Sequence, residues 1–215
     1  DFGVDIQDNT TTVSNLIVES GQLNTKALTY MTFDGSADRV SLDGNQVLAT
    51  DWSFSCWFRA DEFVNNVLIG KSNHQNEIRI SNATIAKVNI NNQGATEYTG
   101  ITTLVADTWY HFVYTRDDST GVGKVYINGV QESTATHHSG NDFTVDYLGS
   151  DGTFWWDGDL RDMRIYDTVI LSDDQVASLY RGSYNVKPTH WWKMDEGTGD
   201  IIDQGLQVGT DSDGD

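Results

Sequence analysis

Aromatic and polar side chains stand together in the stretch FWWDGD, where Phe154, Trp155, Trp156 and Asp157 follow one another. Sugar recognition needs flat aromatic rings against the apolar face of a pyranose, with amides or carboxylates that bond its hydroxyls. At least one of the two tryptophans should be exposed if strand alternation runs through this segment. The alternative is that both serve the packing of a chain with seven tryptophans.

Catalytic chemistry is not visible in the acidic and nucleophilic residues. The acid clusters MDEGTGD and LSDDQ lie in an expected loop and at an expected helix start, where solvent gives no reason for a raised carboxyl pKa. Serine nucleophile elbows, phosphate-binding loops and dinucleotide fingerprints are missing. Cys56, the single cysteine, lies in the apolar run FSCWF and is typical of a buried thiol. We therefore expect a protein that is not an enzyme.

The histidines give one metal hypothesis. His137 and His138 are adjacent in TATHHSG and, with Asp142, offer transition-metal ligands. Adjacent histidines in a polar loop are more often surface residues, because zinc needs further ligands at suitable spacing. His74 and His190 give no stronger signal.

Charge limits the partners. The formal charge is −19, from 32 acidic and 13 basic side chains, and it would repel a phosphate backbone or an anionic membrane surface. We expect no nucleic-acid partner, and no apolar run is long enough for membrane insertion. The excess of aspartate fits divalent cations at loop carboxylates, or solubility alone.

Strand signals dominate from TYMTFDG onward, where turn residues recur about every ten residues, as in a sandwich or barrel. In DWSFSCWFRA, alternation puts Phe54, Cys56 and Phe58 on one face. Asn128 and Gly129 suit the positive φ angles of a type I′ hairpin. At 215 residues, one all-β domain is the expectation.

One short helix interrupts this pattern after LRDMRIYD. Ser172 is the expected N-cap, Gln175 completes a capping box, and Gly182 supplies a left-handed stop. Val176, Leu179 and Tyr180 form one apolar stripe. So short a helix is marginal alone, so its stripe must dock on the sheets.

The ordered phrases FDGSADRVSL, WSFSCWFRA, WYHFVYTRD, GKVYINGVQ and GDLRDMRIYDTVILSDDQVASLYRG resemble the laminin G-like jelly rolls of the concanavalin A-like lectin/glucanase superfamily, with a pentraxin-like order of elements. The resemblance implies an all-β fold, a two-sheet antiparallel jelly-roll sandwich of about six or seven strands a sheet. It also implies one short helix near the C-terminus that closes one edge. Glycan-cleaving relatives carry a strand pattern like E-x-D-x-x-E, which is absent here.

The resemblance divides the chain into three segments. Residues 1–27 are expected to form an N-terminal arm and first strand, and residues 28–195 the laminin G-like jelly roll. Residues 196–215 are an acidic tail or the start of a truncated following segment, because HWWKMDEGTGDIIDQG also resembles the opening phrase of many such domains. The first residue is Asp rather than Met, which indicates processing or excision from a longer chain.

The resemblance also implies Ca²⁺ at a sheet rim. The matching carboxylates are Asp34 and Asp38 in FDGSAD, and Asp159 and Asp162 in GDLRD. Calcium takes six to eight oxygen ligands in irregular geometry, which suits loop carboxylates. The alternative is that these residues make ordinary turns and ion pairs with arginines.

A ligand site is expected on a rim near the tryptophans. In pentraxins an Asp-Asn pair binds calcium before a strand like NEIRI, and here an amide replaces the acid, which argues against pentraxin-style calcium-dependent binding. The expected ligand-binding residues are Trp155, Trp156, Asp151, Asn76, Gln75 and Asn73.

Two functions compete on this basis. The first is a non-catalytic extracellular recognition or adhesion module that binds a glycan or other surface ligand and is stabilised by calcium. The second is a structural protein of a virion surface, spike, fibre or other extracellular assembly, in contact with neighbouring subunits or as a homo-oligomer. Both predict a location outside the cell or on a virion or cell surface.

Overall fold

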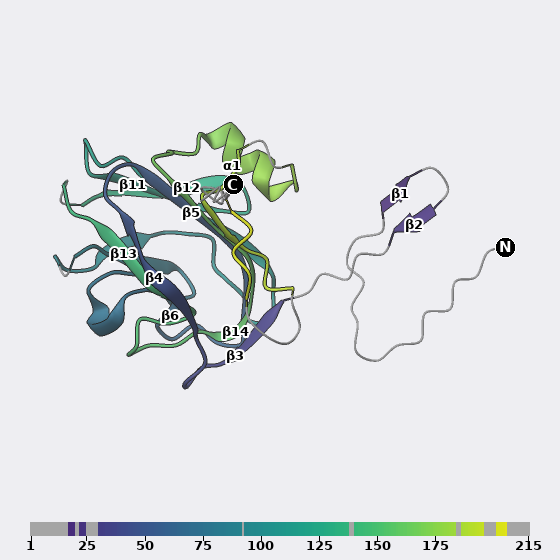
Figure 1. Ribbon diagram of the computed structural model, residues 1–215, viewed down its shortest axis with the longest axis horizontal. Helices are drawn as coiled ribbons and strands as arrows, with labels where there is room; N and C mark the ends of the chain where they lie inside the picture. Colours follow the sequence, from purple (N-terminus) through teal and green to yellow (C-terminus); the bar gives the residue numbers. More distant parts are fainter. Residues whose placement is uncertain are drawn as a thin grey trace, which may run out of the picture.

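The computed structural model describes residues 17–19, 22–24, 30–91, 93–137, 140–183, 186–195 and 201–205. Two antiparallel sheets pack face to face (Figure 1), and the predicted two-sheet jelly-roll sandwich is confirmed. A separate hairpin pairs β1 (Ile17–Glu19) with β2 (Gln22–Asn24). The predicted domain boundaries stay predictions.

The larger sheet has seven strands in the order β12-β11-β10-β5-β14-β15, with β3 also paired to β14. Their bounds are β3 (Met31–Asp34), β5 (Trp52–Ala60), β10 (Tyr110–Arg116), β11 (Val122–Ile127), β12 (Val130–Thr136), β14 (Asp157–Asp167) and β15 (His190–Trp192). The second sheet has six strands in the order β4-β13-β6-β7-β8-β9. These are β4 (Val40–Leu48), β13 (Phe143–Leu148), β6 (Asn66–Gly70), β7 (Glu77–Asn82), β8 (Ile85–Asn89) and β9 (Thr96–Thr99), with the short 3-10 helix η1 (Ser72–His74) before β7.

The core lies between the sheets, as the alternation in β5 predicts. Phe54, Cys56 and Phe58 are all fully buried there, while Trp57 turns to the outer face and is partly exposed. Burial raises the pKa of the Cys56 thiol well above its usual value, so this cysteine stays a neutral core residue.

The hairpin between β11 and β12 has the predicted type I′ turn. Ile127 pairs directly with Val130, so the loop has two residues. Asn128 and Gly129 have φ angles of 50° and 83°, which this turn requires at both central positions.

Helix α1 (Asp173–Tyr180) has the predicted caps. The Ser172 side chain accepts a hydrogen bond from the Gln175 amide, and the Ser172 amide donates to the Gln175 side chain at 2.8 Å. Gly182 ends the helix at a φ of 83°.

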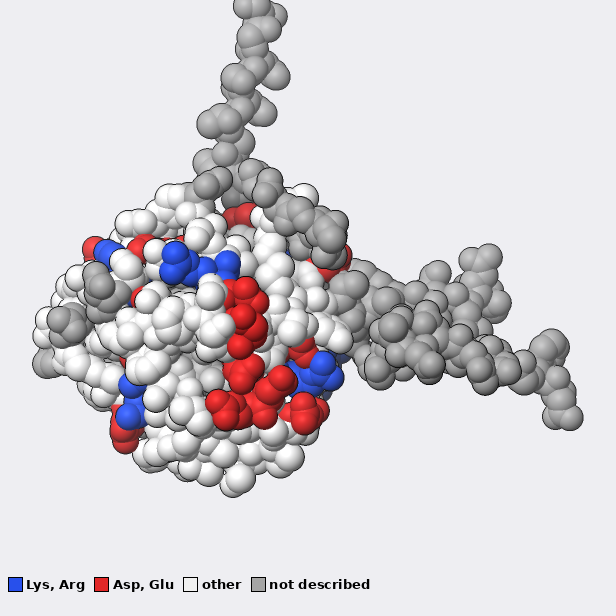
Figure 2. All heavy atoms as spheres, turned by 90° about the horizontal axis from the view of Figure 1, so that it is seen from below, with Lys and Arg blue, Asp and Glu red and all other residues white. Residues whose placement is uncertain are grey.

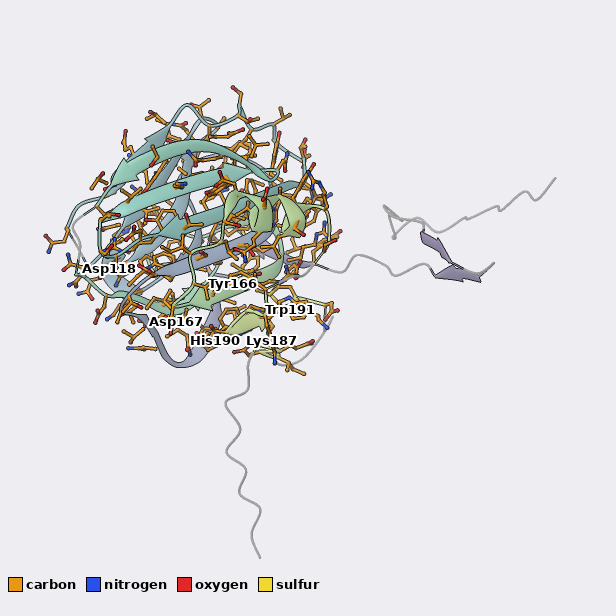
Figure 3. The ribbon with its side chains drawn as sticks, turned by 90° about the horizontal axis from the view of Figure 1, so that it is seen from above. Asp118, Tyr166, Asp167, Lys187, His190 and Trp191 are labelled. Atoms are coloured by element: carbon orange, nitrogen blue, oxygen red, sulfur yellow. The ribbon has the colours of Figure 1, made fainter. Side chains whose placement is uncertain are left out.

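The position of the helix differs from the expectation that it closes one edge of the sandwich. Val176 and Leu179 pack against Val113 and Tyr166 in a second apolar cluster on the outer face of the seven-stranded sheet. Val113 faces outward because its neighbours in β10 face the core. In Figure 3 the helix lies over the strands of this sheet, with Tyr166 labelled on β14.

The chain returns to the sheet after the helix. Strand β15 follows the helix and pairs with β14. Segment 201–205 then lies along β15, where Trp192 bridges Asp203. No helix in the described part of the chain is long and apolar enough to cross a membrane.

Candidate functional site

The loop between β13 and β14, residues 149–156, forms one rim of the sandwich and is called here the rim loop. It is closed by an isolated antiparallel bridge between Ser150 and Trp155. The Ser150 hydroxyl donates to the carbonyl of Phe154 at 2.9 Å and accepts from the amide of Gly152 at 2.8 Å. These local bonds give the loop a fixed shape.

Asp151 anchors the rim loop from inside. Its side chain is fully buried, and Oδ1 accepts hydrogen bonds from the amides of Thr153 and Phe154, each at 2.8 Å. The Asp151 backbone and Cβ pack against Gly70 of β6, where an added Cβ would come within 2.7 Å of the Asp151 Cβ. The other oxygen, Oδ2, is 2.5 Å from Nδ1 of His74.

His74 and Glu77 join this carboxylate from the neighbouring segment. Nδ1 of His74 is 3.3 Å from Oε2 of Glu77, a side chain that is 2% exposed. Burial, with a further contribution from Asp151, raises the pKa of Glu77 to about 7, against the opposing effect of Arg79. Sequence reasoning missed Glu77 and gave His74 no weight, because the contact with Asp151 depends on pairing between distant strands.

The two predicted tryptophans have different positions. Trp156 is fully buried in the core, with its ring edge-on to Phe58 at 5.4 Å between centroids. Trp155 and Phe154 are both partly exposed. The centroid of the Phe154 ring lies 4.8 Å from that of the His74 ring. The aromatic surface of this rim is therefore Phe154 and Trp155, and Trp156 supports it from below.

The predicted polar residues differ in the same way. Asn76 is buried, and its Oδ1 accepts from the amide of Asn91 at 2.7 Å, so it fixes the loop. Gln75 is exposed, and the side chain of Asn73 lies outside the described residues. The structure thus brings Asp151 to the segment that carries Gln75 and Asn76, through His74.

A second partly exposed aromatic surface lies on the outer side of the seven-stranded sheet, where alternation along β10 allows Trp109 to face outward. The Arg161 guanidinium is 4.7 Å from the Trp109 ring centroid and 4.9 Å from that of Trp57. Arg59 lies 5.6 Å from Trp109 and 5.3 Å from Tyr30. We call these five residues the outer-face ladder.

Asp34 and Asp38, two of the predicted calcium ligands, lie in one turn. Oδ1 of Asp34 accepts from the amides of Ser36 and Ala37 at 2.9 and 3.1 Å, which lowers the pKa of Asp34 to about 2. The Asp34 amide donates to Asp38 Oδ2 at 3.2 Å.

Asp159 and Asp162 are engaged elsewhere. Asp159 accepts from Arg59 Nε at 2.6 Å and is 3% exposed. Asp162 accepts from Arg164 at 2.5 Å and from the indole nitrogen of Trp191 at 2.6 Å. The structure therefore does not bring these two carboxylates to the turn.

Other carboxylates gather near that turn. The Asp157 side chain lies against Gly35, and its pKa is raised by burial and by the charges of Asp61, Glu62 and Asp34. Figure 2 shows acidic side chains crowded together on the lower face of the molecule. Accumulated negative charge of this kind is what a calcium ion would neutralise.

The histidine pair of the TATHHSG loop is only half described. Nε2 of His137 lies 2.5 Å from the Tyr98 hydroxyl, and His138 lies outside the described residues. His137 also borders a hollow of about 450 Å³ beside the loop between β8 and β9.

Similar structures share this fold. A native heptameric SAP-like pentraxin from Limulus polyphemus aligns with a TM-score of 0.57 at 14% identity, over 81% of this chain and 90% of the pentraxin. The CBM40 domain of the Ruminococcus gnavus IT-sialidase, bound to α2,3-sialyllactose, gives 0.52 at 15% identity, over 71% and 96%. Domains LG4-5 of the mouse laminin α1 chain give 0.51 at 19% identity, over 70% of this chain and 44% of theirs.

Sequence comparison supplies the family. No curated protein sequence matches the chain. The family profile described as the concanavalin A-like lectin/glucanases superfamily matches residues 34–177, which is more than half of the chain. The predicted kinship is thereby confirmed, and the chain belongs to the concanavalin A-like lectin/glucanases superfamily.

Proposed function

We propose that this chain is a non-catalytic glycan-binding module that works outside the cell. The observation that carries the proposal is the rim, where Phe154 and Trp155 are both partly exposed and the Arg79 guanidinium is 5.2 Å from the centroid of the Phe154 ring. Exposed Gln75 follows on the neighbouring segment. Aromatic faces with adjacent amide and guanidinium donors are the groups that hold a pyranose ring and its hydroxyls.

The similar structures support the same class of ligand. The Ruminococcus gnavus domain is bound to a sialylated sugar. The superfamily to which the chain belongs includes lectins, as its description states. The extracellular setting is proposed by analogy with the laminin and pentraxin domains that share this fold.

The two buried carboxylates near the rim support binding without catalysis. Asp151 is held by two amides of its own loop, and Glu77 is bonded to His74. Glycoside hydrolysis needs two carboxylates that face each other across the sugar bond. Here both carboxylates are buried, with side-chain exposures of 0% for Asp151 and 2% for Glu77.

A glycan array with the wild type and Trp155→Ala tests this proposal. We expect the wild type to bind a defined set of glycans, and Trp155→Ala to bind them about fivefold more weakly, because one stacked ring contributes roughly 1 kcal/mol. Trp109→Ala is the matched control, since it removes a partly exposed tryptophan from the outer-face ladder instead.

Two results would contradict the rim proposal. If Trp109→Ala weakens binding and Trp155→Ala does not, the ligand binds the outer-face ladder. If the wild type binds no glycan, the structural alternative gains. The alternative draws on β12, an edge strand on which Val130 is 62% exposed, because unpaired edges can join neighbouring subunits. The mass measured in solution distinguishes an assembly subunit from a monomeric module.

We also propose calcium at the turn 34–38, with Asp157 as an added ligand. Calorimetric titration with Ca²⁺ is expected to give stoichiometric binding. Thermal melting should show a higher melting temperature with Ca²⁺, and a chelator should reverse this increase. Asp157→Asn should remove both effects, because it deletes the partly buried carboxylate nearest the turn. Glu97→Gln, a change at a remote exposed carboxylate, should remove neither. A wild type without heat of binding would make these aspartates turn residues only.

A further inference from the structure

The cluster of His74, Glu77 and Asp151 has a property that neither sugar contact nor the calcium turn explains. One ligand atom from each residue lies within 4.8 Å of the other two. The residues come from the end of η1, the first position of β7 and the rim loop. Only the packed sandwich brings these segments together, so their convergence belongs to the folded domain.

A single imidazole nitrogen faces both carboxylates. Nδ1 of His74 is 3.3 Å from Glu77 Oε2 in hydrogen-bond geometry, and 2.5 Å from Asp151 Oδ2. Asp151 Oδ2 is buried, and its contact with Nδ1 does not have hydrogen-bond geometry. One N–H group cannot donate well to two carboxylates at once, and a buried carboxylate oxygen that lacks a well-formed hydrogen bond is costly. A cation between the three ligand atoms would bond all of them.

The other atoms of the cluster are held by the chain. Asp151 Oδ1 accepts two backbone amides, and Glu77 Oε1 lies 3.5 Å from Arg79. The Asn89 side chain donates to the His74 carbonyl at 2.6 Å. Such outer contacts orient ligands toward a shared ion. The His74 side chain is 34% exposed, which gives an ion a path from solvent.

The donor set selects the class of ion. Calcium and magnesium prefer oxygen ligands throughout, whereas one imidazole with two carboxylates suits zinc and other first-row divalent ions. Three protein ligands leave at least one coordination position for water or a ligand hydroxyl. We propose that His74, Glu77 and Asp151 form a binding site for a divalent transition-metal ion of the zinc class, beside the partly exposed Phe154 ring.

The test uses the full chain after treatment with chelator. Calorimetric titration with Zn²⁺ is expected to show one ion bound at this site, and millimolar Ca²⁺ should not compete for it. Thermal melting should show a higher melting temperature with Zn²⁺ than without it. Co²⁺ should give visible absorption bands that an aquo ion lacks. Glu77→Gln, which keeps the side-chain shape, and His74→Ala should each weaken Zn²⁺ binding about tenfold or more.

His190→Ala is the matched control. Nδ1 of His190 lies 2.6 Å from Asp203 Oδ2, so this residue repeats the His–Asp pair on β15 (Figure 3). Its change should leave Zn²⁺ affinity at the wild-type value. The proposal would be overturned if Zn²⁺ still binds with wild-type affinity in both His74→Ala and Glu77→Gln. It would also be overturned if the wild type binds no Zn²⁺, and the cluster would then hold a proton instead of a metal ion. Neither readout involves a sugar, so failure here is separate from failure on the array.

Discussion

Trp156→Ala is expected to destabilise the domain by about 3–5 kcal/mol, the usual cost of removing a large aromatic side chain from a packed interior. Trp156 is fully buried and packs edge-on against Phe58. Chemical denaturation followed by circular dichroism measures this loss as a lower midpoint with an unchanged slope.

The adjacent tryptophan is the control for this substitution. Trp155 is partly exposed, so Trp155→Ala should cost less than about 1.5 kcal/mol while it weakens sugar binding. The two variants should therefore separate stability from recognition. Equal destabilisation by both would mean that Trp155 is also a packing residue and would remove it from the proposed ligand surface.

Gly158→Ala is expected to cost at least about 3 kcal/mol, from the clash of an added methyl group together with the strain of a positive φ. Gly158 lies in β14 between β3 and β5 with a φ of 119°, and an added Cβ would come within 2.2 Å of the Arg59 carbonyl oxygen. Because β14 positions both the acidic turn and the rim loop, calcium and sugar binding should weaken with stability.

A matched glycine separates the clash from the backbone strain. Gly100 has a φ of 76°, and an added Cβ there meets nothing within 4 Å. Gly100→Ala should cost only the strain, about 1–2 kcal/mol. Similar melting temperatures for the two variants would show that β14 adjusts to a side chain at position 158.

Elements governed by local rules were predictable from the sequence. The alternation of Phe54, Cys56 and Phe58 predicted the core face of β5, and the Ser172 and Gln175 pair predicted where the helix begins. Both follow from side-chain period and capping, which need no knowledge of distant strands. The surface on which the helix docks depends on outward residues of three strands, so the helix ends alone could not place it.

The site was less predictable because it depends on register and loop shape. The Ser150–Trp155 bridge folds the rim loop back on itself, so simple alternation does not say which tryptophan is buried. The contact of His74 with Asp151 requires β6 to pair with β13. Asp159 and Asp162 were chosen by resemblance. The stated alternative of an arginine partner holds for Asp162, which pairs with Arg164, whereas the Arg59 partner of Asp159 on β5 became visible only in three dimensions.

The seven-stranded sheet separates two apolar cores of unequal size, with α1 covering only the smaller one. If α1 detaches from the sheet, Val113 and Tyr166 become exposed, but the aromatic residues between the two sheets stay buried. Amide hydrogens of α1 should therefore exchange with solvent through a local opening, while those of β5 and β10 wait for global unfolding. We therefore expect α1 to open at a lower free energy than the sandwich, which carries the proposed sugar-binding rim.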